Sequence, residues 1–178
     1  MAGMSNDGVV AADGSEGDGK ATSVDGVRFR EVLGHFATGV TIVTAMEQDG
    51  PVGFTCQSFT SLSLDPPMVA LAPAKSSTSW PRIRQAGIFC VNVLEVRQED
   101  LCKSFARSGG DKFSGVVWRQ GVNGAPVLEG ALAWIECSLH LAHDAGDHEI
   151  VFGNALDMGT NPGSPLLFYQ GEFGGFTQ

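Results

Sequence analysis

The sequence predicts a mainly β protein with a few short helices. Apolar runs rich in Val, Ile and Phe recur along the chain and are bounded by Gly, Pro and Asp, as β-strands are. Helical periodicity is confined to short segments between these runs. Hydrophobic residues make up 43% of the chain against 17% charged residues, so a well-packed core can form. The pattern is typical of a closed barrel, in which no sheet edge remains exposed.

The 178 residues suit one folded domain preceded by a short tail. Residues 1–24 are rich in Gly, Asp, Ser and Ala and contain little that can be buried, which predicts a disordered tail. The folded domain is therefore expected to span residues 25–178.

The first predicted element is a helix that begins near residue 28. Its apolar residues share one face, at i, i+3, i+4 and i+7: Phe29, Val32, Leu33 and Phe36. Asp25 is the candidate N-cap and Gly39 the candidate stop. The β-branched run over residues 39–45 is apolar on both parities, which predicts a buried strand, and residues 52–57 form its predicted hairpin partner.

Short strands and helices are expected to alternate in the middle of the chain. Residues 66–73 and 87–94 are apolar runs that predict strands. A short helix is predicted over residues 77–87, because Pro81 would fall in its first turn, where proline is tolerated. A further helix is predicted over residues 96–109, and one of its faces is apolar: Leu101, Cys102 and Phe105.

The longest β signal covers residues 131–159 and predicts two long strands joined by a tight turn at residues 144–147. On the first of these strands the odd positions are apolar: Ile135, Cys137, Leu139 and Leu141. The even positions are polar and are expected on the other face: Glu136, Ser138 and His140. Residues 166–173 predict one terminal strand.

Charge and hydropathy exclude several classes of partner. The net charge is −9, with 11 basic against 20 acidic residues, which argues against nucleic-acid binding. No apolar run approaches the roughly 18 to 20 residues that cross a bilayer, and the N-terminus lacks a signal-peptide pattern. We therefore expect a cytoplasmic protein with no nucleic-acid or membrane partner.

Common signatures of metal sites, disulfides and nucleophilic catalysis are absent from the sequence. The chain has no G-x-S-x-G elbow, no phosphate-loop motif and no glycine fingerprint between a strand and a helix. His140 and His143 are an odd number of residues apart on a strand and point to opposite faces, so we expect no metal site. Four widely spaced cysteines are expected to be free, mostly buried thiols: Cys56, Cys90, Cys102 and Cys137.

Residues 53–67 stand out because hydroxyl and amide side chains alternate with Phe and Leu. The polar members are Thr55, Gln57, Ser58, Thr60, Ser61 and Ser63. Buried polar groups need hydrogen-bond partners, so this segment is either a loop whose Ser and Thr cap their own backbone or a wall against a flat polar heterocycle. Downstream, Lys75 precedes three hydroxyl residues and a predicted helix, a pattern that favours a phosphate. Ser77 or Thr78 alone would equally serve as an N-cap.

Four blocks of this sequence, in this order, resemble the short-chain flavin reductases that supply reduced flavin to two-component monooxygenases. The blocks are FREVLGHFATGVTIVT, GFTCQSFTSLSLDPPMV, KSSTSWPRIRQAGIFCVNVL and GDHEIVFGNALD, and LLFYQGEF matches the terminal strand of these proteins. The likeness covers nearly the whole chain after residue 27. It is strongest to reductases of actinobacterial pathways, in steroid degradation or antibiotic biosynthesis.

The resemblance implies a split β-barrel homodimer that binds FAD or FMN near the subunit interface and oxidises NADH. The isoalloxazine edge would be lined by Thr55, Cys56, Gln57 and Ser58, with Ser61 and Ser63 nearby. The ribityl phosphate would be reached by Lys75, Ser76 and Ser77. The remaining candidates are His148, which would help to place the nicotinamide, Phe113 and Tyr169 as aromatic neighbours, and Thr38 and Gly39, which either join the cofactor site or serve only the bend. Gln57 replaces the Asn of many members, and its longer side chain would shift one ring contact.

The activity implied by the resemblance is hydride transfer from the nicotinamide C4 to the flavin N5, with the reduced flavin passed to a partner monooxygenase. The cofactors carry this chemistry, so the protein supplies orientation and electrostatics. NADH is preferred to NADPH because no Arg cluster indicates a clamp for a 2′-phosphate. Two alternatives remain open: an electron carrier of the flavoredoxin kind that retains its flavin, and a non-catalytic split-barrel binding module. A pyridoxamine-phosphate oxidase-like activity is a more distant alternative.

Overall fold

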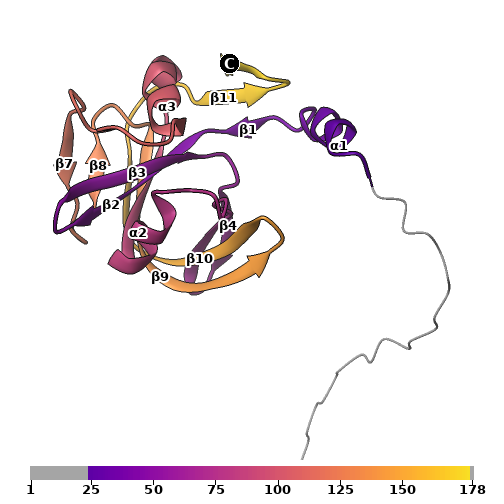
Figure 1. The fold of residues 1–178 in the computed structure, drawn as a ribbon. Helices are drawn as coiled ribbons and strands as arrows, with labels where there is room; N and C mark the ends of the chain where they lie inside the picture. The colour runs from indigo at the N-terminus through magenta and orange to yellow at the C-terminus, as the bar shows by residue number, and fades with distance from the viewer. Residues whose placement is uncertain (1–23, 177–178) are drawn as a thin grey trace, which may run out of the picture.

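The computed structural model describes residues 24–176 and is mainly β with a few short helices, as predicted (Figure 1). The predicted disordered tail, except for Val24, lies outside the described residues. No helix of the described part is long and apolar enough to cross a membrane. The elements in chain order are α1 (Gly26–Leu33), β1 (Thr38–Gly39), β2 (Thr41–Glu47), β3 (Gly50–Cys56), β4 (Thr60–Leu64), β5 (Pro67–Leu71), α2 (Trp80–Ala86), β6 (Ile88–Val93), η1 (Val96–Gln98), α3 (Glu99–Ala106), β7 (Trp118–Gln120), β8 (Pro126–Leu128), β9 (Ala133–Ala145), β10 (His148–Thr160), β11 (Leu166–Tyr169) and β12 (Glu172–Gly175).

A seven-stranded antiparallel sheet with the strand order β3-β2-β6-β9-β10-β5-β4 forms the body of the molecule. Its two edge strands, β3 and β4, are consecutive in the chain and are joined by residues 57–59 only. The edges of a flat sheet of this size would lie roughly 29 Å apart, whereas the link from Cys56 to Thr60 spans at most about 14 Å. The sheet must therefore curl until its edges approach each other at this link.

The curled sheet is open between β3 and β4, because no hydrogen-bond ladder joins these two strands within residues 24–176. The closed barrel expected from the residue pattern is wrong in this respect. The split β-barrel implied by the family resemblance is confirmed. The two edge strands of the main sheet, β3 and β4, therefore face each other across this opening.

Strand β2 is buried on both faces, as its continuous apolar run predicts. Val43 packs on one side in a cluster with Trp80 of α2, and Ile42 packs on the other side in a cluster with Phe105 of α3. All four side chains are buried. The helices α2 and α3 thus cover opposite faces of the β2–β3 hairpin, and the end of α3 is brought close to the end of β3.

Two predicted boundaries near the chain ends are wrong. The first helix has the predicted Asp25 cap, whose Oδ1 accepts from the Val27 N–H at 3.2 Å, but it ends at Gly34 rather than Gly39. The Gly34 carbonyl accepts from the Gln170 N–H at 3.0 Å, which ties the helix end to the C-terminal hairpin. The predicted single terminal strand is that hairpin, β11–β12, because Gln170 and the residue after it adopt positive φ.

Glu136 was predicted on the polar face of β9, opposite the apolar face, and it is fully buried there. The segment that follows β7 covers it, and the Asn123 N–H donates to the Glu136 Oε2 at 2.7 Å. A Cβ on Gly121 would lie 2.6 Å from the same carboxylate, so the segment can lie this close only because residue 121 is a glycine. The alternation of polar and apolar residues along β9 gave no sign of this cover.

Replacing Gly153 by alanine should destabilise the barrel. Gly153 is buried at an irregularity of the β9–β10 ladder, and a Cβ there would lie 2.7 Å from the Phe89 ring and 3.2 Å from the Cys137 Cβ. Overpacking of this kind lowers the free energy of unfolding by about 1 to 3 kcal/mol. Urea denaturation measures the change, with Gly174→Ala as the control because a Cβ there meets nothing within 4 Å. Equal stability of the two variants would contradict the packing described.

Candidate functional site

A cleft of about 580 Å³ opens at the split in the barrel. Its volume lies within the range of small-molecule binding sites. One wall is the end of β3 and the link to β4, the opposite wall is the segment between β5 and α2, and the end of α3 closes a third side. The lining residues are Phe54, Thr55, Cys56, Gln57, Ser58, Ala72, Pro73, Ala74, Ser76, Ser77, Thr78, Ser79, Phe105, Ala106, Arg107, Ser108, Lys112 and His148.

Hydroxyl groups join the elements that form the walls of the cleft. The Ser58 Oγ donates to the Ala72 carbonyl at 2.9 Å and accepts from the Ala72 N–H at 2.8 Å, so one side chain satisfies both backbone groups of a residue just beyond β5. The Thr55 Oγ1 donates to the Cys102 carbonyl at 2.7 Å and joins β3 to α3. Part of the polar segment is therefore structural, and it sets the distance between the cleft walls.

The β9–β10 turn is anchored to the segment between β5 and α2. The Lys75 N–H donates to the Asp147 carbonyl at 2.9 Å, and the Glu149 N–H donates to the Pro73 carbonyl at 3.0 Å. These backbone bonds hold His148 at the rim of the cleft.

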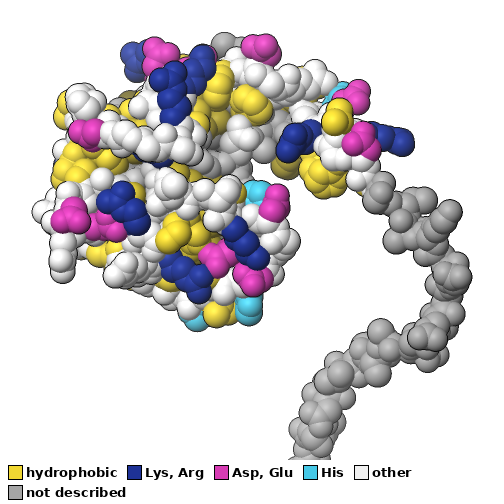
Figure 2. Space-filling view, viewed as in Figure 1, with side chains coloured by type: hydrophobic (Ala, Val, Ile, Leu, Met, Phe, Trp, Pro, Cys, Tyr) yellow, Lys and Arg dark blue, Asp and Glu magenta, His cyan; other side chains and the backbone are white. Residues whose placement is uncertain are grey.

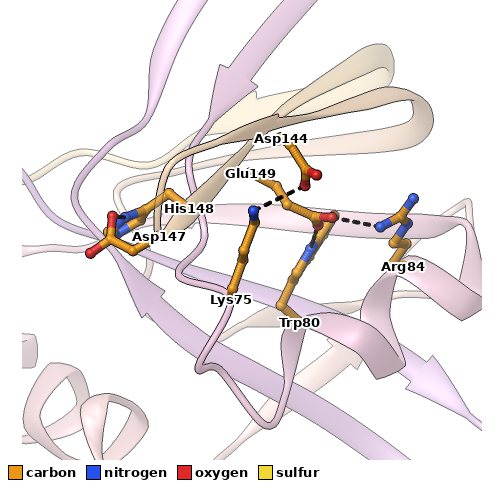
Figure 3. A network of polar contacts seen from close by, with 7 residues as sticks. All are labelled: Lys75, Trp80, Arg84, Asp144, Asp147, His148 and Glu149. Carbon is orange, nitrogen blue, oxygen red and sulfur yellow. Dashed lines mark hydrogen bonds and ion pairs between the residues drawn. The ribbon is translucent and has the colours of Figure 1, made fainter.

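Side chains of the same region form the network drawn in Figure 3. The Glu149 carboxylate accepts from the Trp80 indole N–H and from Arg84 at 2.6 Å, which fixes α2 against the start of β10. The His148 Nδ1 lies 2.7 Å from the Asp147 Oδ1, and this hydrogen bond lowers the pKa of Asp147. With Nδ1 engaged, the His148 Nε2 is the ring nitrogen left to meet a ligand.

Among residues 24–176, no acidic side chain lines the cleft, although the whole chain carries a net charge of −9. Its charged lining residues are the basic Arg107 and Lys112, and His148 adds a third nitrogen base. Positive charge in a concave site favours an anionic ligand. The arrangement suits a ligand that carries negative charge.

The chain matches the model of the "Flavin reductase like domain" over residues 33–177. The chain belongs to the flavin reductase-like family. This confirms the resemblance stated from the four sequence blocks.

Individual members of the family are similar over most of their length. A flavin reductase from Pseudomonas putida is 52% identical over 157 residues, which cover 87% of this chain and 92% of that protein. The reductase subunit HsaB of a flavin-dependent monooxygenase from Rhodococcus jostii is 46% identical, over 98% of this chain and 86% of that protein.

Solved structures of the family have the same fold. Nitrilotriacetate monooxygenase component B from Mycobacterium thermoresistibile matches with a TM-score of 0.82 and 47% identity, over 85% of this chain and 86% of that chain. The NADH:FAD oxidoreductase SgcE6 from Streptomyces globisporus, in complex with NAD and FAD fragments, matches with a TM-score of 0.80 and 38% identity, over 85% of this chain and 92% of that chain.

About half of the site residues predicted from the flavin reductase motifs line the cleft. Those that line it are Thr55, Cys56, Gln57, Ser58, Ser76, Ser77 and His148. Ser77 also has the capping role considered from the sequence, because its Oγ accepts from the Trp80 N–H at 3.1 Å. The roles of these residues toward a ligand remain predictions.

The other predicted site residues do not line the cleft. Ser61 and Ser63 lie on β4, Thr38 and Gly39 pair with β11, Phe113 packs against Phe105 and Trp118, and Tyr169 lies on β11 beside His35. The Lys75 Nζ forms an ion pair with the Asp144 Oδ1 at 3.2 Å (Figure 3), so its ammonium is directed to the β9–β10 hairpin.

Two charged residues of the cleft were not predicted from the sequence. Arg107 and Lys112 flank the glycine pair Gly109 and Gly110, both of which have positive φ, in the loop after α3. Loops have no periodicity, so nothing in the pattern connects this segment with residues 53–58. The available signal was the glycine pair itself, because adjacent glycines often mark a tight turn that positions its neighbours.

The thiols of the protein should be unreactive in the native state. Cys56 lines the cleft but is buried, and burial raises its pKa, as it raises the pKa of Cys102 and, to about 12, that of Cys137. The thiolate is the reactive species, so an aromatic disulfide reagent at pH 8 should modify these thiols only after denaturation. Rapid modification of Cys56 in the native protein would contradict this prediction.

Proposed function

We propose that the chain is an NADH-dependent flavin reductase that reduces free FAD or FMN and supplies the reduced flavin to a partner monooxygenase. The observation that carries the proposal is the cleft of about 580 Å³ without acidic residues at the barrel split, in a chain of this family. The names of relatives support it, since one is a monooxygenase reductase subunit, one an NADH:FAD oxidoreductase and one, from Agrobacterium fabrum, an FMN reductase using NADH.

The cleft residues fit a flavin by their chemistry. The segment from Thr55 to Ser58 would offer backbone groups to the edge of a ring, and the exposed Gln57 amide lies on the same wall. The Ser76 and Ser77 hydroxyls and the Arg107 guanidinium suit a phosphate, and Lys112 adds a positive charge to the same cleft. A bound flavin supplies the hydride-accepting chemistry. The protein then holds the ring at the split and excludes part of the water around it.

Absorbance at the nicotinamide band tests this function directly. NADH oxidation by the purified protein should rise with added FAD or FMN and be slow without flavin. A protein that copurifies yellow and ignores added flavin would instead be an electron carrier. The absence of oxidation with both flavins, and with NADPH as well as NADH, would contradict the reductase function and favour a binding module.

His148 should contribute to nicotinamide binding. Its backbone is fixed by the anchored turn and its ring lies at the cleft rim, so His148→Ala should raise KM for NADH about tenfold, equivalent to about 1.4 kcal/mol, while flavin affinity changes little. His140→Ala, on the exposed part of β9, is the matched control. A parallel loss of flavin affinity in His148→Ala would assign the residue to the flavin site instead.

We also propose that the functional unit is a homodimer, on the evidence of α1. This helix stands away from the barrel at the end of β1 (Figure 1), and it has no buried residue. Its apolar stripe is exposed, with Phe29 at 55% and Val32 at 60% of full accessibility, and Figure 2 shows hydrophobic side chains on its surface. An amphipathic helix with an uncovered apolar stripe needs a partner surface.

Placing a charge on this stripe should dissociate the dimer. Val32→Glu should shift the molecular mass in sedimentation from that of two chains to that of one, because the carboxylate would be desolvated in the interface. Val117→Glu is the control, since Val117 is similarly exposed (64%) in a loop of the barrel. A wild-type protein that sediments as one chain would refute the homodimer.

A further inference from the structure

Lys112 joins three elements at the base of the cleft. Its Nζ donates to the Phe105 carbonyl at 3.0 Å, to the Gly53 carbonyl at 3.2 Å and to the Ser79 Oγ at 3.4 Å. These acceptors belong to the end of α3, to β3 and to the residue just before α2. Each lies within a few residues of a cleft wall: Thr55 follows Gly53, Ser77 precedes Ser79, and Arg107 follows Phe105. All three N–H donors of the ammonium are therefore used to position the walls.

The close approach of α3 to β3 depends on a glycine. A Cβ at position 53 would lie 2.8 Å from the Phe105 ring, so only glycine allows the ring to lie against the strand. The Phe105 carbonyl and the Gly53 carbonyl are thereby brought within reach of one ammonium group. The lysine site is built by the packing of the barrel and does not result from a chance surface contact.

The charge of Lys112 has no acidic partner among residues 24–176. Its three acceptors are neutral, and no carboxylate oxygen of the described residues lies within 4 Å of its Nζ. The neighbouring Asp111 is turned toward its own backbone, where its Oδ1 accepts from the Phe113 N–H at 3.0 Å. A half-buried cation with only neutral partners is costly unless an anion approaches it.

We propose that Lys112 is a positioning residue of the cleft. Its positive charge strengthens the binding of flavins that carry a negative charge relative to that of neutral flavins. The inference deepens the proposed function and depends on it. The negative charge can come from the phosphate of the flavin or from the reduced ring. Either anion would attract the Lys112 ammonium in the same way. Burial lowers the pKa of Lys112 in the ligand-free protein. An anion in the cleft would raise the pKa of Lys112 again, because the anion and the charged lysine stabilise each other.

Removal of this charge should weaken anion binding selectively. In Lys112→Met, which keeps a long side chain of similar shape, binding of the anionic ligand should weaken on the order of tenfold, as expected for a charge at short range in a partly buried site. Lys112→Arg keeps the charge and should retain most of the selectivity. Lys103→Met is the matched control, because Lys103 carries the same charge on the exposed face of α3, where it pairs with Glu99 at 2.5 Å.

Fluorescence titrations of FMN and riboflavin, each in the oxidised state and in the reduced state under anaerobic conditions, give dissociation constants for the test. A lower preference for FMN over riboflavin in Lys112→Met assigns the charge to the phosphate. A lower preference for reduced over oxidised riboflavin assigns it to the ring, and either result supports the proposal.

Unchanged ratios in a folded Lys112→Met protein, with wild-type binding intact, would overturn the proposal and leave the reductase function standing. Absence of flavin binding by the wild type would overturn both. Melting temperatures check folding, and Lys112→Gln, which retains donors for the Gly53 and Phe105 carbonyls, replaces Lys112→Met if that variant unfolds.

Discussion

The short link between the two edge strands is the constraint on which the rest of the structure depends. Because residues 57–59 must connect β3 to β4, the seven-stranded sheet curls, yet the two edges do not pair. Within the link, the Ser58 Oγ donates to the carbonyl and accepts from the N–H of Ala72, the residue after β5, and so joins the link to the opposite wall of the cleft. The opening becomes a cleft with fixed walls, which explains why small hydroxyl side chains are concentrated in this segment.

The second determinant of the site is the distribution of charge. The surface is acidic overall, but the carboxylates around the cleft are engaged: Asp144 with Lys75, Glu149 with Arg84 and Trp80, Asp111 with its own backbone, and Asp147 with His148 at the rim. The groups that remain in the cleft are basic or neutral. An acidic protein can thus bind an anionic nucleotide at one place and repel anions over most of its remaining surface.

The sequence predicted what depends on local pattern or on a family motif. The buried run of β2, the long β9–β10 hairpin and the cleft residues from Thr55 to Ser58 were predicted because periodicity, turn residues and motif all act over short distances in the chain. Burial of Glu136, the ion pair of Lys75 with Asp144 and the contacts of Lys112 with Gly53 and Ser79 depend on residues distant in sequence. The end of the first helix at Gly34 likewise depends on a contact with Gln170. No local pattern in the sequence indicates these contacts.

Hydrogen exchange with and without FAD or FMN tests most directly whether the split of the barrel is the flavin site. The account predicts slower exchange of backbone amides in residues 55–58 and 74–79 and in the loop from Arg107 to Lys112, with little change in the separate β7–β8 sheet, which does not line the cleft. Protection confined to other segments, or no protection at flavin concentrations that support turnover, would contradict it.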